Sequence, residues 1–229
     1  MDKKFLSDTV LFRGIEPEEV QSMLECLKAK KRWYRKGEMV FRAGERTASM
    51  GVVLSGVISI EIDDVWGNKS LLSRIEPGQI FGETYACLSE EQMMVNAVAA
   101  EDSEVLFLDT GRIMELCPQT CPYHGALVRN LVTVLSQKNL GLSRRMIHLT
   151  AKSIRGRLSS YLSYESVKQG KREFMIPYNR QQLADYLNVD RSALSNELSK
   201  MQREGLLWTE KNRFCLLDAD TSDSFFMTE

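Results

Sequence analysis

Between residues 31 and 109 the chain consists of short apolar runs separated by glycines. The runs are MVF (39–41), MGVVL (50–54), VISIEI (57–62), SLLSRI (70–75) and EVLFLD (104–109). The run at 57–62 alternates apolar and polar residues, as a strand with one buried face does. Many short strands at this spacing are typical of a small antiparallel barrel or jelly roll, in which glycine provides the tight corners. We therefore predict a β-roll here.

Helical periodicity flanks the predicted roll on both sides. Residues 8–30 predict a short helical segment, because Pro17 suits a first helical turn and the apolar residues that follow recur at helical spacing. Residues 123–149 predict a long helix whose apolar stripe includes Val128, Leu131, Leu135 and Leu142. This stripe indicates either a helix that pairs with a second copy of the chain or a helix buried within one subunit; we favour the dimer helix.

The last third predicts a helix (RGRLSSYLSYESVKQ), a short strand (REFMIPY), two helices joined by a tight turn, and two strands around Lys211-Asn212 that form a wing. Asn179 is placed to cap the first of the paired helices, with Gln182 returning the bond. Asp190 is the expected N-cap of the second. Asn188 lies at the turn, and asparagine tolerates the left-handed backbone region that a sharp turn requires.

The second of the paired helices carries an outward face of short polar groups. Leucines and a methionine at helical spacing predict its buried side, which leaves Arg191, Ser192, Ser195, Asn196 and Ser199 outside. Such a face suits the DNA major groove, where arginine pairs with guanine and asparagine with adenine. The alternative is an ordinary solvated face. Nearby cations favour DNA: Arg180, Lys200, Arg203, Lys211 and Arg213.

Composition and charge agree with a β-roll followed by a basic, helical C-terminal part. A chain of 229 residues with 43% hydrophobic residues suits two small domains. Residues 151–217 contain 12 Lys and Arg against 7 Asp and Glu, although the whole chain has a net charge of −1, so a polyanion is the expected partner of that end. No run is long enough for a membrane span, and the five cysteines lack a disulfide framework. We expect a soluble, cytoplasmic protein with no membrane partner.

Several stretches, taken together, resemble one family across nearly the whole chain. GEMVFRAGE, GVVLSGVISI and PGQIFGE are similar to the effector barrel of the cyclic AMP receptor protein and fumarate–nitrate regulator (Crp/Fnr) superfamily of bacterial transcription factors. SIRGRLSSYL and NRQQLADYLNVDRSALSNELSKMQREGLL are similar to its DNA-binding domain. The resemblance implies an α+β fold with a cyclic-nucleotide-binding-like β-roll (1–116), a dimerisation helix (117–150) and a winged helix-turn-helix (151–229).

The resemblance also implies a homodimer that binds double-stranded DNA at an inverted repeat, with RNA polymerase as a candidate partner. Arg191, Ser192, Ser195 and Asn196 occupy the family's base-facing positions, and Arg180, Lys200 and Arg203 are the expected neighbouring contacts. The two best-known branches carry Arg-Glu at 191 and 192 and Arg at 196. Ser192 and Asn196 therefore predict a different half-site.

The expected effector region departs from the nucleotide-binding pattern. Gly82 and Glu83, followed by Thr84 and Tyr85, match the family's nucleotide-binding turn. Its phosphate-pairing Arg and Ser would align with Val95 and Asn96, and its Thr-Ser pair on the dimer helix with Leu142 and Ser143. No Lys, Arg or His occurs between Arg74 and Arg112, and a buried anion without a counter-charge is costly. We therefore expect an unknown small effector other than cyclic AMP.

Several alternatives stay open. Glu83 can serve only to hold the turn, and Met93, Met94, Val95, Leu142 and Tyr85 can line a ligand pocket or fill the barrel. Cys117, Cys121 and His124 form C-x3-C-x2-H, which suits a redox- or metal-responsive regulator or, equally, a plain connector. A cyclic-nucleotide-binding module acting on a protein partner is a further alternative. Both histidines lie beyond the roll and no catalytic signature occurs, so we do not expect an enzyme or a bound metal, and the sequence identifies no cofactor.

Overall fold

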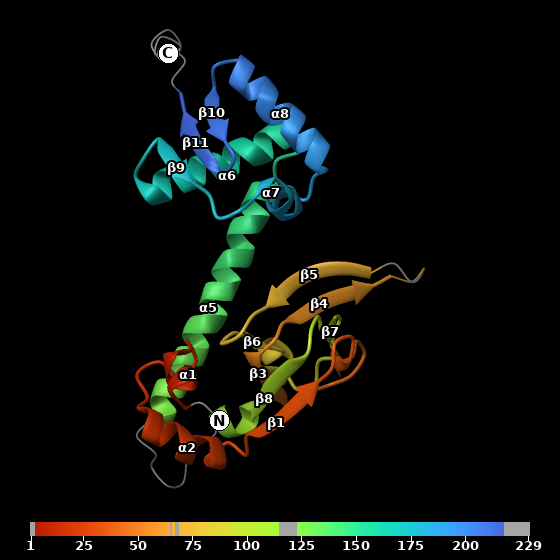
Figure 1. Cartoon of the computed structure of the whole chain (residues 1–229), viewed down its shortest axis with the longest axis vertical. Helices are drawn as coiled ribbons and strands as arrows, with labels where there is room; N and C mark the ends of the chain where they lie inside the picture. The colour runs from red at the N-terminus through yellow and green to blue at the C-terminus, as the bar shows by residue number, and fades with distance from the viewer. Residues whose placement is uncertain (1–2, 65, 67–68, 115–122, 218–229) are drawn as a thin grey trace. The chain divides into compact units, whose positions relative to one another are not determined.

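The computed structural model describes residues 3–64, 66, 69–114 and 123–217 (Figure 1). The chain divides into two compact units, residues 1–137 and 138–229, and the long helix α5 (His124–Leu149) belongs to both. The β-roll, the long helix and the C-terminal winged helix-turn-helix confirm the predicted fold class. The predicted domain boundaries after residues 116 and 150 stay a prediction. Among the described helices, none is long and apolar enough to cross a membrane.

The first unit is built on two four-stranded antiparallel sheets. One contains, in spatial order, β1 (Lys30–Tyr34), β8 (Ser103–Asp109), β3 (Ser49–Ser55) and β6 (Ile80–Phe81); the other contains β2 (Met39–Phe41), β7 (Asn96–Ala99), β4 (Ile58–Asp63) and β5 (Lys69–Ile75). Each of the five apolar runs coincides with a strand, which confirms that prediction. The pattern missed β1, β6 and β7, because KKRWY is mostly charged, β6 has only two residues, and NAVA contains a single large apolar residue.

Two apolar cores lie on opposite faces of the first sheet. On one face, α1 (Lys3–Asp8), α2 (Pro17–Cys26) and the first half of α5 pack against β3 and β8, as with Val52 and Leu106. On the other face, the two sheets enclose the interior of the roll around Val53, Phe81 and Val105. The expected helical segment at 8–30 is helical only from Pro17 to Cys26, with Pro17 in the first turn as predicted. Two short helices, α3 (Glu83–Cys87) and α4 (Thr110–Met114), complete the unit.

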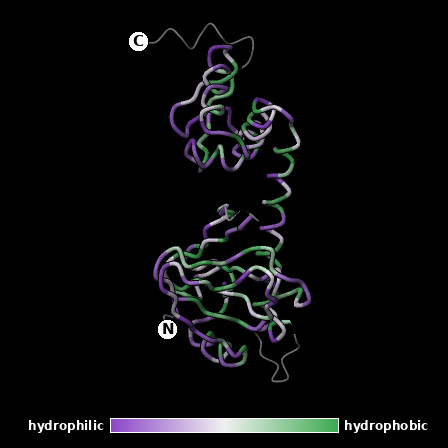
Figure 2. Tube along the Cα trace, turned by 90° about the vertical axis from the view of Figure 1, so that its right-hand side faces the viewer, coloured by the Kyte–Doolittle hydropathy of each residue, from purple (hydrophilic) through white to green (hydrophobic). Residues whose placement is uncertain are grey.

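The second unit is a helix-turn-helix with a small sheet. It contains α6 (Ile154–Gln169), β9 (Glu173–Met175), α7 (Arg180–Leu187), α8 (Arg191–Arg203), β10 (Leu207–Glu210) and β11 (Arg213–Leu216). The strands form an antiparallel sheet in the order β10-β11-β9, so the predicted wing and the preceding strand are confirmed. Figure 2 shows hydrophobic stretches alternating with hydrophilic ones along the elements of both units, as expected for elements that bury one face.

Local hydrogen bonds cap the two helices of the helix-turn-helix at the residues that the sequence predicted. Asn179 and Gln182 form a reciprocal capping box at the start of α7. Asn188 ends α7 in the left-handed region with φ of 51°. Asp190 caps α8 by accepting from the backbone N–H groups of Ser192 and Ala193. All three predictions are confirmed, because each depends on groups within a few residues.

Candidate DNA-binding and effector sites

The outward face of α8 presents two large polar side chains with free donors. Leu194, Leu198 and Met201 hold the opposite face in the core, with exposures of 0%, 2% and 4%. Arg191 and Asn196 are exposed, and within the described part of the chain neither side chain forms a hydrogen bond or an ion pair. Their donors and acceptors are therefore available to a partner molecule.

The two serines of the predicted set are already engaged within the helix. The Ser192 hydroxyl donates to the Asp190 carboxylate, a bond that lowers the pKa of Asp190 together with the bonds from the helix N-terminus. The Ser195 hydroxyl is half-buried and donates to the Arg191 carbonyl oxygen at 2.9 Å. These serines thus differ from Arg191 and Asn196, because a DNA contact through them requires an existing bond to be shared or broken.

Among the neighbouring cations, Lys200 and Arg203 are exposed on α8, whereas Arg180 is not free. The Arg180 guanidinium is half-buried, lies 5.1 Å from the ring centroid of Phe214, and donates to Thr209 Oγ1 at 2.8 Å. Burial lowers its pKa. Arg180 therefore connects the start of α7 to the wing, a role that sequence reasoning missed because both partners lie about thirty residues away.

Two arginines of α6 hold the helix-turn-helix, and sequence reasoning missed both. Arg157 donates to the carbonyl oxygens of Ala151, Leu187 and Asn188 at 3.0, 3.1 and 2.9 Å, and so bridges the start of α6 and the end of α7. Arg155 lies 2.5 Å from Glu197 and 2.7 Å from Glu204, and the hydrogen bond from Arg155 lowers the pKa of Glu204. Carbonyl acceptors are present at every position, so no sequence signal marks the ones that Arg157 uses.

The end of α5 enters the second unit through a buried histidine. His148 is 2% exposed, its Nδ1 lies 2.9 Å from Ser160 Oγ, and it packs against the rings of Tyr161, Tyr164 and Tyr186. Burial lowers the pKa of His148. The neutral imidazole is therefore the form that this packing favours.

In the first unit, the Gly82–Glu83 turn has a backbone conformation that requires glycine. Gly82 has φ of 74°, and a Cβ placed there would come within 2.8 Å of Phe41 Cε2, so glycine is needed for both conformation and space. Glu83 is 5% exposed and begins α3. Thr84 is exposed, and Tyr85 is half-buried with its Oη accepting from Met94 N at 3.3 Å.

The two residues aligned with the family's Arg-Ser pair do not offer free polar groups. Asn96 is 6% exposed; its Oδ1 accepts from Ala43 N at 2.8 Å and its Nδ2 donates to Asp63 at 3.1 Å, so the amide joins neighbouring segments of the roll. Val95 is half-buried. The amide of Asn96 is therefore bonded to groups of the same chain. Its polar character alone did not indicate this structural role.

The other predicted effector residues lie in varied surroundings. Met93 is 4% exposed and Met94 is 76% exposed, so only Met93 belongs to the interior. On the part of α5 that belongs to the second unit, Leu142 is 68% exposed, and Ser143 Oγ lies 3.4 Å from Asn139 Oδ1. The structure thus places Gly82 to Tyr85 together, with Val95 and Asn96 in the same unit.

The cysteine-histidine motif is described only at its end. Cys117 and Cys121 lie outside the described residues, so the redox or metal alternative stays a prediction. His124 is buried, and its Nε2 lies 2.8 Å from the Arg112 carbonyl oxygen, to which it donates. No group of three metal-ligating side chains occurs within the described ranges.

Family models match both units. A cyclic nucleotide-binding domain model matches residues 31–120, and a Crp-like helix-turn-helix domain model matches residues 156–221, so that together they cover more than half of the chain. The pairing of these two modules in this order is the arrangement that the fold displays. The chain belongs to the Crp/Fnr family of transcriptional regulators.

Relatives of this Crp/Fnr-family chain are similar to it in sequence along most of its length. The cyclic AMP receptor protein of Thermus thermophilus is 25% identical over 86% of this chain and 87% of its own. The transcriptional activator FnrA of Stutzerimonas stutzeri is 25% identical over 81% of this chain and 75% of its own. These relatives are transcriptional regulators, a non-enzymatic family, which agrees with the expectation that the chain is not an enzyme.

Solved structures share the fold of this Crp/Fnr-family chain. The catabolite activator protein of Thermus thermophilus has a TM-score of 0.53 at 24% identity, covering 93% of this chain and 96% of its own. CprK in complex with OCPA has a TM-score of 0.63 at 18% identity, covering 88% of this chain and 92% of its own. At these identities the likeness concerns the fold and not the ligand.

Proposed function

We propose that this Crp/Fnr-family regulator binds an inverted-repeat operator as a homodimer, and that a small effector other than cyclic AMP controls it. Two-fold symmetry requires two half-sites whose centres lie about 34 Å apart, one helical turn of DNA. The contacts to phosphate make the complex sensitive to salt.

The observation that supports operator reading is the free polar face of α8. Arg191 and Asn196 are exposed and unpaired in the described chain, on a helix whose other face is fixed in the core. In the major groove, Arg191 pairs with guanine and Asn196 with adenine, and each bidentate pair contributes about 1–3 kcal/mol of base discrimination. Lys200 and Arg203 bind phosphate, which adds affinity without sequence preference.

The observation that supports a homodimer is an exposed apolar stripe on α5. Of the predicted stripe only Leu142 is exposed (68%), whereas Val128, Leu131 and Leu135 pack against the core of the first unit. Leu142 shares its exposed face with Val132 and Met146, which are 53% and 67% exposed and occupy a and d positions of a coiled-coil seam. Asn139 lies at an intervening position of that seam, where a polar residue specifies register at some cost in stability. A second copy of α5 buries this stripe.

The observation that supports an effector other than cyclic AMP is the absence of side-chain cations from the segment around Gly82. An anion at this turn meets backbone N–H groups but no Lys, Arg or His between residues 75 and 111. The Asn96 amide is bonded to Ala43 and Asp63. A cyclic nucleotide is the second candidate, favoured by the match of residues 31–120 to a cyclic nucleotide-binding domain and by the Gly82–Glu83 turn.

The test is selection of bound sequences from a random duplex pool by the purified full chain at near-physiological salt, without ligand and with cyclic AMP. We expect the selected sequences to contain an inverted repeat, and we expect cyclic AMP not to increase the affinity of the protein for it. Arg191→Ala and Asn196→Ala should each relax one position of the half-site, whereas the matched variant Lys200→Ala should weaken binding to all sequences alike. Unchanged base preference in both α8 variants would refute this placement of the helix. A repeat recovered only with cyclic AMP would support the second candidate.

A further inference from the structure

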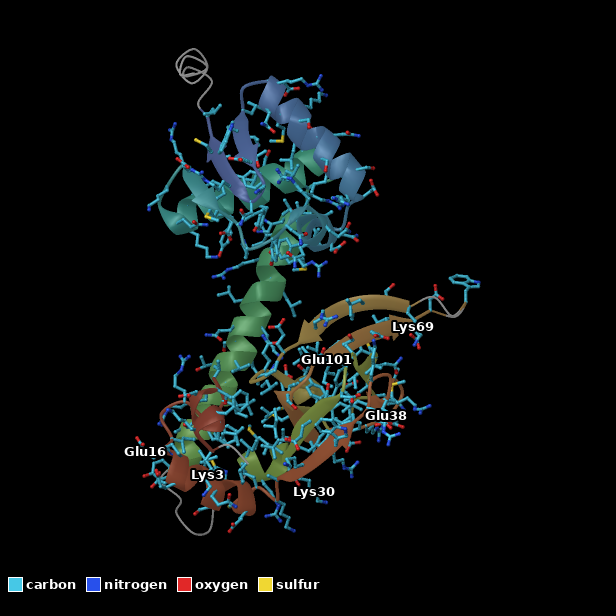
Figure 3. All side chains as sticks on the ribbon, in the orientation of Figure 1. Lys3, Glu16, Lys30, Glu38, Lys69 and Glu101 are labelled. Atoms are coloured by element: carbon cyan, nitrogen blue, oxygen red, sulfur yellow. The ribbon has the colours of Figure 1, made fainter. Side chains whose placement is uncertain are left out.

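A pocket opens at the edge of the roll, on strands that do not include the Gly82 turn. It has a volume of about 240 Å³ and lies between β1, the β2–β3 region and β8. Arg32 and Lys30 stand on β1, Thr47 precedes β3, and Tyr34, Phe41 and Phe107 provide aromatic surface. Figure 3 labels Lys30 at the start of β1.

The pairing of β1 with β8 directs its cations toward this pocket. Lys30 pairs with Phe107 and Arg32 with Val105, a buried residue of the roll interior. Paired residues of antiparallel strands share a face, so Lys30 and Arg32 lie on the interior face of the sheet. Lys31 points to the other face, where it lies 2.8 Å from Glu104.

The cations of the pocket lack a carboxylate partner. In the described ranges of the chain, neither Lys30 nor Arg32 forms an ion pair, and no acidic residue lines the pocket. The Arg32 guanidinium lies 5.9 Å from the ring centroid of Phe107. Two uncompensated positive charges therefore border an opening into the roll.

The floor of the pocket is aromatic and only half-buried. The ring centroid of Phe107 lies 5.7 Å from that of Phe41 and 6.3 Å from that of Tyr34, both in edge contacts. These three rings retain exposed surface although they belong to the interior of the roll. An apolar ring placed on them gains area burial and aromatic contacts.

Size and charge together define the ligand class. At the packing density of protein interiors, a cavity of about 240 Å³ accommodates about 180 Å³ of molecular volume. That is enough for a small aromatic acid. A carboxylate at the rim accepts from the Arg32 fork in bidentate geometry and from Lys30.

We propose that Arg32 and Lys30, above the rings of Tyr34, Phe41 and Phe107, form a binding site for a small aromatic carboxylate. The site also contacts the Gly82 turn, because Phe41 packs directly against Gly82 and lies 5.6 Å from Phe81 between ring centroids. A ligand on Phe41 thus contacts the residue that supports the Gly82–Glu83 backbone. This proposal does not rest on operator binding, and its test contains no DNA.

A purely structural account of the same charges exists. Inward-facing charges on an edge strand discourage pairing between sheets of different molecules, and β1 is an edge strand. That account requires no ligand, no preference for a carboxylate and no dependence on the Phe107 ring. A binding experiment with matched ligands and variants therefore separates the two accounts.

The experiment is isothermal titration calorimetry of the full chain with benzoate and phenylacetate, with benzamide and acetate as matched ligands. We expect both aromatic acids to bind, and benzamide and acetate to bind at least about tenfold more weakly. Arg32→Met should lower the affinity for benzoate about ten- to hundredfold, which is the effect of losing a charge-assisted hydrogen bond. Phe107→Leu should also weaken it.

The control variant is Arg35→Met, which removes one positive charge from the same segment outside the pocket lining. It should leave benzoate affinity unchanged, and Lys30→Met provides a second pocket variant if Arg32→Met does not fold. Absence of benzoate and phenylacetate binding up to about 10 mM overturns the proposal. Equal losses in Arg32→Met and Arg35→Met, or equal affinity for benzamide and benzoate, also overturn it.

Discussion

Replacing Arg157 with methionine tests how the helix-turn-helix is held together. Methionine keeps an apolar stem but removes the donors that reach the carbonyl oxygens of Ala151, Leu187 and Asn188. A hydrogen bond contributes about 1 kcal/mol net, so the loss of three bonds should lower the stability of the second unit by about 3 kcal/mol. The guanidinium is half-buried, so water can solvate part of what is lost and this value is an upper figure.

Trp208 allows the effect to be measured in the second unit alone. The chain has three tryptophans, and Trp33 and Trp66 belong to the first unit. In a Trp33→Phe/Trp66→Phe background, the fluorescence of Trp208 reports urea unfolding of the second unit. At a slope of about 1.5 kcal/mol/M, a loss of 3 kcal/mol lowers the midpoint by about 2 M urea.

Lys152→Met is the matched control, because Lys152 is exposed two residues before α6 and forms no hydrogen bond within the described residues. Its midpoint should stay within about 0.3 M of the parent, since surface substitutions without such contacts change stability by less than about 0.5 kcal/mol. If the two methionine variants unfold at the same urea concentration, the three bonds of Arg157 do not stabilise the motif and the reasoning fails.

Three further predictions concern caps, pH and backbone strain. Asn179→Ala removes the capping box and should cost about 1 kcal/mol in the Trp208 assay, whereas Asn179→Asp, which keeps an acceptor, should not. Burial lowers the pKa of His148 below its ordinary 6.5, so the unfolded state binds more protons and stability should fall as pH drops from about 7 to 5. His148→Gln should show a smaller decrease, and an identical pH dependence would contradict the assignment. Gly82→Ala, with φ of 74° and a Cβ within 2.8 Å of Phe41, should lower the thermal midpoint of the first unit, and Phe41→Leu should restore part of it; no change in Gly82→Ala would contradict the strain.

Sequence reasoning succeeded where structure depends on neighbouring residues. The capping box at Asn179, the left-handed Asn188 and the Asp190 cap are all present. The five apolar strands lie where alternation and glycine corners placed them. Strand β1 was missed because its charged sequence carries no apolar run, although its pairing with β8 is complete from Lys30 to Tyr34.

Two residues with predicted functional roles have partners far away in the sequence, and their functional assignments stay predictions. Arg180, which is predicted as a DNA contact, donates to Thr209 and packs on Phe214. Asn96, which is predicted at the effector site, accepts from Ala43 N and donates to Asp63 through its amide. A sequence shows that a side chain is polar and not whether its hydrogen bonds are already made within the protein.

The sequence by itself determined the order of the modules, the type of each helix cap and the polar composition of the α8 face, because periodicity and capping act over a few residues. Only the tertiary structure decided which cations are committed and which are free. Arg155, Arg157 and Arg180 are held by groups about thirty to fifty residues away, whereas Arg32 is left at the rim of a pocket. The physical reason is that a hydrogen bond or an ion pair depends on which groups are close in space. Groups from separate segments become close only when the strands and helices that carry them pack together.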